Sequence, residues 1–221
     1  MGKRGPKPKK IISEKWDSNL AYAIGLLVTD GCMSKTGHLI DLTSKDREQL
    51  LNYSRCLNIK NKIGKKNNGH GQMALRIQFR NVFFYKFLIK IGITPAKSKT
   101  LGPLKIPDKY FFDFLRGCFD GDGYTYSYWD KRWKSSFMFY IGFASASIKF
   151  VHWLQNTIFS RLGIKGHITT AGLKNICYQL KYAKKDGFKL MKKMFYAPDV
   201  ICLTRKRLKI EETLSIVGKR L

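Results

Sequence analysis

The 221 residues suffice for one large domain or two smaller ones, each able to bury a hydrophobic core. Apolar residues make up 44% and aromatic residues 14% of the chain, which excludes a largely disordered protein. Lys and Arg (42) far outnumber Asp and Glu (15), giving a net charge of +27. A surface this basic favours a nucleic-acid partner over acidic lipid or a purely structural role.

The sequence contains none of the common signals for membranes, secretion or zinc. No apolar run approaches the ~20 residues of a membrane-spanning helix, and the basic start lacks the apolar stretch of a secretory signal. The five cysteines and four histidines form no CxxC or His-x-x-x-His spacing. We therefore expect free thiols in a reducing intracellular compartment, either the cytoplasm or an organelle matrix.

After a basic arm over residues 1–12, which is either a solvated tail or a DNA-tracking segment, the chain consists of two copies of one unit. Hydrophobic periodicity predicts that the first copy has a helix at 15–28, a strand at 38–44, a helix at 45–59, a turn at 65–71, a strand at 74–79 and a helix at 82–93. The second copy is expected to have a helix at 110–119, a strand at 139–144, a helix at 147–164, a strand at 178–182 and a helix at 187–195.

The strands come in hairpins without βαβ crossovers. This pattern predicts an α+β protein whose two sheets are related by pseudo-twofold symmetry. We place the first repeat at 13–103 and the second at 104–221, with a hinge over 101–107.

Each repeat begins with a predicted helix that has an Asp in its last turn, and a Gly follows that Asp. The two segments are AIGLLVTDG at 23–31 and LRGCFDGDG at 115–123. Small residues recur along one face of each helix, so that the two helices can pack backbone to backbone; these residues are Ala21, Gly25, Thr29, Gly117 and Gly121.

Such packing would bring Asp30 and Asp122 side by side beneath a basic surface. Two carboxylates suit Mg²⁺, which takes a few carboxylates, waters and phosphate oxygens as ligands. Either Asp-Gly pair alone is typical of an ordinary helix end. Their occurrence at equivalent points of a repeat in a +27 protein indicates a functional pair.

The two segments resemble the signature helices of the LAGLIDADG homing endonucleases, and KSKTLGPLKIP before the second is similar to the segment between that family's repeats. The resemblance covers nearly the whole chain from Ser18. It implies a monomer with an αββαββα unit twice, the signature helices at the centre, and two antiparallel sheets forming a saddle on double-stranded DNA. It also implies a metal site at Asp30 and Asp122, for which we include the preceding Thr29 and Gly121, while the sixth motif positions (Val28 and Asp120) are not ligands.

Hydrolysis of a phosphodiester needs an activated water and stabilisation of the phosphate and the leaving oxygen, which metal ions at the two acids would supply. Mg²⁺ is the expected ion, with Mn²⁺ replacing it and Ca²⁺ binding without cleavage. Lys97 matches the family's pocket lysine, and its second-repeat counterpart is either Arg205 or Lys206. Ser44 and Ser145, at equivalent strand ends, are candidates for positioning water or are simply solvated.

Alternate side chains of a strand share a face, and Arg and Gln suit the edges of guanine and adenine. A basic, aromatic hairpin at 124–136 is expected to embrace the DNA. The predicted DNA-contacting residues are Arg76, Gln78 and Arg80 in the first repeat, and Lys131, Arg132, Lys134, Gln179 and Lys181 in the second.

The predicted function is therefore an intron-encoded endonuclease that cuts both strands of a long DNA site. Two alternatives keep the fold: a maturase that binds intron RNA, and a DNA-binding relative that does not cleave. Retention of both acids and Lys97 disfavours the latter, because a binder gains nothing from carboxylates facing phosphates. The chain ends, Met-Gly-Lys and Lys-Arg-Leu, are not those expected of a free-standing intein, and motifs of other enzyme classes are missing.

Overall fold

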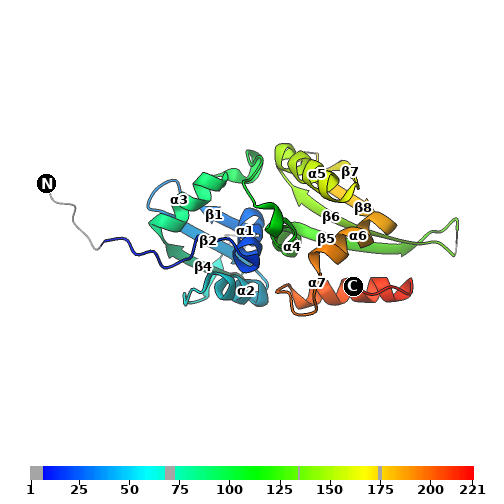
Figure 1. The fold of residues 1–221 in the computed structure, drawn as a ribbon, viewed down its shortest axis with the longest axis horizontal. Coiled ribbons are helices and arrows are strands. Elements are labelled where there is room, and N and C mark those ends of the chain that lie inside the picture. The colour runs from blue at the N-terminus through cyan, green and yellow to red at the C-terminus, as the bar shows by residue number, and fades with distance from the viewer. Residues whose placement is uncertain (1–6, 68–72, 134, 174–175) are drawn as a thin grey trace.

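Two four-stranded antiparallel sheets, one in each repeat, form the framework of the computed structural model, which describes residues 7–67, 73–133, 135–173 and 176–221 (Figure 1). The first repeat comprises α1 (Ser18–Asp30), β1 (Gly31–Met33), β2 (Leu39–Ser44), α2 (Arg47–Leu57), β3 (Gly64–Asn67), β4 (Met73–Arg80) and α3 (Val82–Ile91). The second comprises α4 (Phe111–Asp122), β5 (Gly123–Trp129), β6 (Phe137–Ser145), α5 (Ile148–Leu162), β7 (His167–Ala171), β8 (Cys177–Ala183) and α6 (Lys184–Met194).

The two repeats share one topology. Their sheets have the strand orders β1-β2-β4-β3 and β5-β6-β8-β7. The αββαββα unit thus occurs twice, and the predicted α+β class with two pseudo-symmetric repeats is confirmed. An additional helix, α7 (Thr204–Ile216), follows the second unit.

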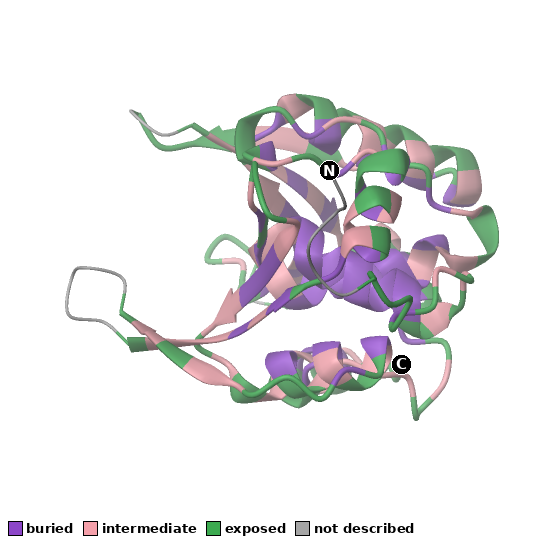
Figure 2. Ribbon diagram, turned by 90° about the vertical axis from the view of Figure 1, so that its left-hand side faces the viewer, coloured by how far each residue is buried: buried purple, intermediate pink, exposed green. Residues whose placement is uncertain are grey.

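The helices α1 to α6 lie on one side of the strands and leave the other side of the sheets open (Figure 2). Burial alternates along the strands accordingly. In β4, Ile77 and Phe79 belong to the buried core, whereas Arg76, Gln78 and Arg80 are less buried and share the opposite, helix-free face. The predicted sharing of one face by these three side chains agrees with the structure.

The helices α1 and α4 pack against each other at the centre of the molecule (Figure 1). A Cβ added at Gly25 would lie only 2.7 Å from the backbone nitrogen of Cys118, and one at Gly117 only 3.0 Å from the Cα of Gly25. Both positions therefore require glycine, because the two backbones leave no room for a side chain. This is the close approach that the spacing of small residues predicts.

Both central helices extend further toward their C-terminal ends than the sequence predicts. The helix expected at 15–28 begins at Ser18, where the carboxylate of Asp17 accepts a 2.7 Å hydrogen bond from the backbone N–H of Leu20, and it ends at Asp30. The helix expected at 110–119 ends at Asp122. The two acids are consequently the last residues of their helices.

Five elements differ from the prediction. Residues 65–67, predicted as part of a turn, belong to β3, and the rest of that turn, 68–71, lies outside the described residues. The sequence patterns did not predict β1, β7 or α7. The hairpin expected at 124–136 contains a strand as far as Trp129, so its tyrosines lie on a sheet and not in a loop.

The connection between the repeats packs against the rest of the fold. Three of its residues are buried: Leu101, Leu104 and Ile106. The backbone N–H of Lys105 donates to the carbonyl of Ile91 at 2.9 Å. Apolar burial and a backbone hydrogen bond therefore attach this segment to the fold, and the predicted hinge stays a prediction.

No helix within the described ranges has the length and apolar character to cross a bilayer.

Candidate active site

The C-terminal ends of α1 and α4 bring Asp30 and Asp122 together. Gly121 lies directly against the end of α1, where an added Cβ would be 2.9 Å from Oδ2 of Asp30. Asp30 is half-buried and Asp122 is exposed to solvent. The absence of a side chain at Gly121 allows the two carboxylates to share one site.

Both carboxyl groups have raised pKa values. Although Asp122 reaches solvent, the surrounding helix ends remove much of its water, and this desolvation, followed by the negative charge of Asp30, raises the pKa of Asp122 to about 6. Desolvation also raises the pKa of Asp30, where a hydrogen bond from Gln49 acts in the opposite direction. A bound cation would offset both the desolvation of the two carboxylates and their mutual repulsion, so the site favours cation binding.

Gln49, on α2, holds the Asp30 carboxylate in place. Its Nε2 donates to Oδ2 of Asp30 at 2.6 Å, and its Oε1 accepts from the hydroxyl of Ser44, also at 2.6 Å. Gln49 is buried, so these bonds are shielded from competing water. No sequence pattern indicated Gln49, although it follows Ser44 by five positions on a helix that starts beside the site.

The second repeat lacks this arrangement. Five positions after Ser145, at the place equivalent to Gln49, the chain has the buried residue Phe150. The Ser145 hydroxyl accepts a 3.1 Å hydrogen bond from the backbone N–H of Ser147. The two predicted water-positioning serines therefore stand in different surroundings, and only Ser44 is connected to an acid.

Two lysines approach the acids from equivalent directions. The buried Lys97 donates to the carbonyl of Gly31, directly after Asp30, and Lys206 donates at 2.7 Å to the carbonyl of Gly123, directly after Asp122. Lys206 also donates to the carbonyls of Phe119 and Gly121, at 2.6 and 2.9 Å. Desolvation lowers the pKa of Lys97 and lowers that of Lys206 to about 8.

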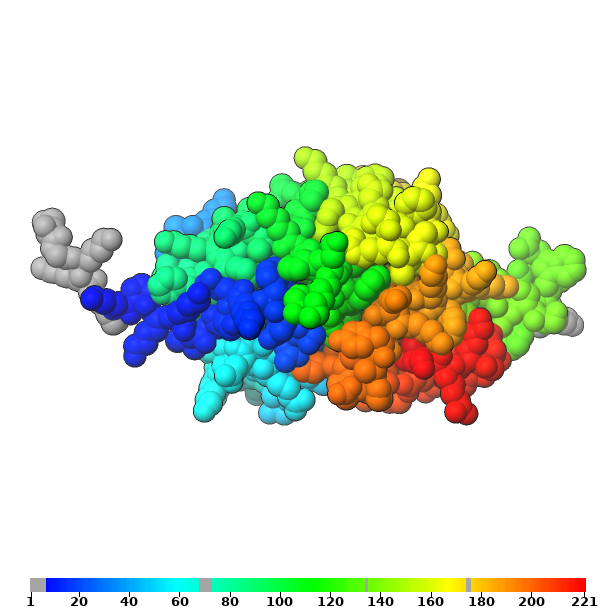
Figure 3. Space-filling view, in the orientation of Figure 1, coloured from blue at the N-terminus to red at the C-terminus, as the bar shows by residue number. Residues whose placement is uncertain are grey.

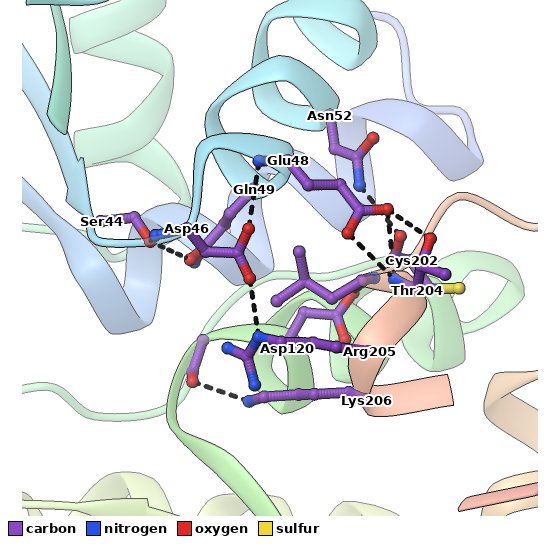
Figure 4. A network of polar contacts seen from close by, with 12 residues as sticks. Ser44, Asp46, Glu48, Gln49, Asn52, Asp120, Cys202, Thr204, Arg205 and Lys206 are labelled. Carbon is purple, nitrogen blue, oxygen red and sulfur yellow. Dashed lines mark hydrogen bonds and ion pairs between the residues drawn. The ribbon is translucent and has the colours of Figure 1, made fainter. Parts of the chain in front are cut away.

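Lys206, and not Arg205, is thus the geometric counterpart of Lys97. Arg205 is mostly exposed and its Nε pairs with Oδ2 of Asp46 at 2.7 Å. Figure 4 shows Arg205 directed toward Asp46 and Lys206 directed toward the end of α4. The two neighbours point in different directions because they leave the first turn of α7 about 100° apart. The sequence left Arg205 and Lys206 as alternatives, and these contacts favour Lys206 as the counterpart of Lys97.

Asp120 anchors the segment that carries Lys206. Its Oδ2 accepts hydrogen bonds from the Tyr22 hydroxyl and the backbone N–H of Leu203, both at 2.7 Å. Desolvation raises the pKa of this buried carboxyl to about 6. On the other side, Thr204 donates through its backbone and hydroxyl to Glu48 of α2. The start of α7 is therefore held by both repeats, and in Figure 3 the orange residues near 200 meet the cyan first repeat.

An open cleft of about 580 Å³ lies beside this site, lined by Asp30, Ser44, Gln49 and Arg205 among others. Within the described chain, no three His, Cys, Asp or Glu side chains gather as a metal cluster. The two acids nonetheless fit a hard divalent cation whose other ligands come from water and phosphate. Of the remaining predicted metal residues, the Thr29 hydroxyl donates to the carbonyl of Leu26 and the Gly121 carbonyl accepts from Lys206. A metal-binding role for these two residues stays a prediction.

Two of the three predicted DNA-contacting residues of the first repeat, Arg76 and Gln78, lie against a buried acid, Asp41, whereas Arg80 is exposed. Gln78 donates to the Asp41 carboxylate at 3.1 Å, and Arg76 lies 3.8 Å from it. Lys66, which the sequence reasoning did not select, completes the group at 3.9 Å. Because Asp41 orients these side chains, the face is a preorganised set of hydrogen-bonding groups.

In the second repeat, Gln179 and Lys181 lie on the helix-free face of β8, and Oε1 of Gln179 accepts from the Tyr124 hydroxyl at 3.2 Å. Lys131 and Arg132 are exposed in the loop after β5, where Arg132 pairs with Asp130 at 3.4 Å. The predicted contact residue Lys134 lies outside the described residues.

The central glycine-packed helices, the duplicated units and the paired acids define the two-repeat LAGLIDADG fold. The similar solved structures include the meganuclease I-SmaMI bound to uncleaveable DNA (12% identity, 91% of this chain and 92% of that one, TM-score 0.62). They also include the homing endonuclease I-DmoI in complex with DNA and Mn (15%, 81% and 97%, 0.53) and the N-terminal LAGLIDADG domain of WhiA (13%, 90% and 88%, 0.51). No protein-family model and no curated protein matches the chain. The predicted resemblance is confirmed at the level of the fold.

Proposed function

We propose that the protein is a site-specific DNA endonuclease that cuts both strands of a duplex with the help of divalent metal. The observation that carries the proposal is the juxtaposition of Asp30 and Asp122 at the ends of the packed helices. The backbone carbonyl after each acid accepts a hydrogen bond from a lysine, the buried Lys97 or the partly buried Lys206. The likeness to I-SmaMI and I-DmoI, both solved with DNA, supports it.

The duplex would lie across the helix-free faces of the two sheets, with its scissile phosphates over the ends of α1 and α4. Mg²⁺ is the proposed ion, replaceable by Mn²⁺; when bound, it would supply an activated water and stabilise charge on the phosphate. Asp30 and Asp122 would hold the metal, and Gln49 would keep Asp30 in one orientation. The ammonium groups of Lys97 and Lys206 would offset the negative charge that develops on the phosphate.

A monomer is sufficient for this chemistry. Both acids and both lysines come from one chain, and the segment carrying Lys206 is held by Asp120 of the second repeat and Glu48 of the first. Each repeat would serve one DNA strand, so that a single chain makes a double-strand break.

The test is to incubate the purified protein with a large pool of random duplex DNA and Mg²⁺, with a matched EDTA sample, and to sequence the new ends. We expect Mg²⁺-dependent breaks with short, uniform overhangs at one long motif. Recovery of a bound but uncut motif would replace endonuclease with a DNA-binding protein. Failure to retain any duplex would reject both.

A further inference from the structure

Four tyrosine rings stack on the helix-free face of the second sheet. Tyr124, Tyr126 and Tyr128 follow one another along that face of β5, and Tyr140 of β6 lies opposite Tyr126 in the register. The rings of Tyr126 and Tyr140 are 4.7 Å apart at 9°, and those of Tyr126 and Tyr128 are 6.4 Å apart at 9°. Gly142 leaves room for the row, because a Cβ there would lie 2.5 Å from the ring of Tyr124.

The equivalent face of the first sheet has the opposite character. In the register, Cys32 pairs with Asp41 in the first repeat where Tyr124 pairs with Gly142 in the second. The acid that organises Arg76, Gln78 and Lys66 is thus replaced by a glycine covered by an aromatic ring. Duplication has therefore produced one charged face and one largely neutral, aromatic face.

The neutral face remains exposed to solvent. Tyr126 and Tyr128 are 38% and 46% exposed, an arrangement that leaves apolar ring edges in water until a partner covers them. Lys181 lies on the same face, and Lys131 and Arg132 extend from the end of the β5–β6 hairpin. A basic border around an aromatic face complements a nucleic-acid duplex, in which phosphates flank a groove that carries apolar groups on the base edges.

The stacking decides which part of the rings is available. The face of Tyr126 is covered by Tyr140, and Tyr124 and Tyr128 lie on either side along the strand, so a base cannot insert between the rings as on a single-strand platform. The exposed ring edges of Tyr126 and Tyr128 are the parts of the row that can meet a duplex groove. The apolar group that a base pair presents in the major groove is the 5-methyl of thymine.

We propose that the second repeat reads thymine methyl groups through Tyr126, Tyr128 and Tyr140, while the first reads base edges by hydrogen bonds from Arg76, Gln78 and Lys66. This inference rests on the proposed DNA-binding function. The target then has two halves of different chemistry: the half beneath the second sheet is rich in A·T pairs, and the other is read through guanine and adenine edges.

The test begins with selection of bound sites from a random duplex library, with Ca²⁺ in place of Mg²⁺ to hold the DNA uncut. The dissociation constant of the selected duplex is then measured with thymine replaced by uracil in one half at a time, which removes only methyl groups. We expect about fourfold weaker binding for each contacted methyl lost in the tyrosine half, the value for burial of one such group. Tyr126→Ser should reduce the difference in affinity between the thymine and uracil duplexes. Arg76→Ala should weaken binding to both duplexes and leave that difference unchanged.

Equal affinity for the thymine and uracil duplexes in the tyrosine half would overturn the inference while leaving the endonuclease proposal untouched. Stronger binding of single-stranded DNA, or association of the chain with itself through this face, would overturn it as well. Failure to select any duplex would instead reject the proposed function. Because the change is made in the DNA, the uracil comparison does not depend on a variant that folds.

Discussion

Lys206 contacts three backbone carbonyls at the end of α4, whereas Lys97 contacts one at the end of α1. The sequence identified Lys97 but did not distinguish Arg205 from Lys206. The two are adjacent basic residues, and only their burial and contacts in the folded structure show which one approaches the acids. Gln49 was missed for a related reason. Its role depends on a hydrogen bond to Asp30, nineteen positions away, and no local pattern encodes that contact.

Replacing Gln49 by Leu keeps the size of the side chain but removes the amide that fixes Asp30. We expect cleavage to fall by about 10–100-fold, as for residues that orient metal ligands, with DNA affinity nearly unchanged. Initial cleavage rates at several Mg²⁺ concentrations measure this. The matched control is Gln155→Leu on α5, outside the site, which should cleave normally. An equal loss in both variants would assign the effect to folding.

The pH dependence of cleavage follows from two shifted groups. The carboxyl of Asp122, with a pKa of about 6, must lose its proton to bind metal, so activity should rise as pH increases through 6. The ammonium of Lys206, with a pKa of about 8, loses its charge above that value, so activity should fall again. A bell-shaped profile of kcat/KM at low Mg²⁺ is expected.

The variant Lys206→Arg separates the two limbs, because a guanidinium stays protonated throughout this range. In this variant the fall in activity on the alkaline side should occur at higher pH, while the rise in activity on the acid side should occur at the same pH as before. An unchanged alkaline limb would assign that titration to a different group.

At the scale of elements, the packing of α1 on α4 requires glycine at their contact. Gly25→Ala would force its Cβ against the backbone of α4. We expect a loss of about 2–3 kcal/mol, or a fall in Tm of roughly 4–12 °C. Thermal unfolding measures it. The control, Gly102→Ala, meets nothing within 4 Å and should shift Tm little. Similar Tm values for the two variants would contradict the close approach.

The elements that the sequence predicted are the long ones with strong hydrophobic periodicity, such as α2, α5 and β4. Those it missed have little periodic signal. β1 has three residues, and most side chains of β7 are exposed. The exposed face of α7 mixes charged residues with Leu208 and Ile216, and its position depends on contacts with the distant residues Asp120 and Glu48. Tertiary contacts, which single-sequence patterns do not contain, define these elements.

At the scale of the whole molecule, the net charge of +27 belongs to a protein with one open, strand-built side. If this side covers a long duplex, many phosphates are neutralised and their counterions released. With 6–10 phosphate contacts, raising the salt from 50 to 200 mM should weaken binding by about 10³–10⁵-fold. Titrations at several salt concentrations test this, and affinity that barely depends on salt would argue against a saddle on DNA.

In the proposed endonuclease, Asp30 and Asp122 together cut the two strands of a duplex. The most direct measurement is cleavage of a supercoiled plasmid carrying the selected site by Asp30→Asn and Asp122→Asn, alongside Asp199→Asn, which removes the same charge from an exposed position away from the two acids. We expect that neither acid variant yields linear product, although both still bind the site, and that the control linearises the plasmid normally. Normal linearisation by either acid variant would exclude the proposed role of the two acids.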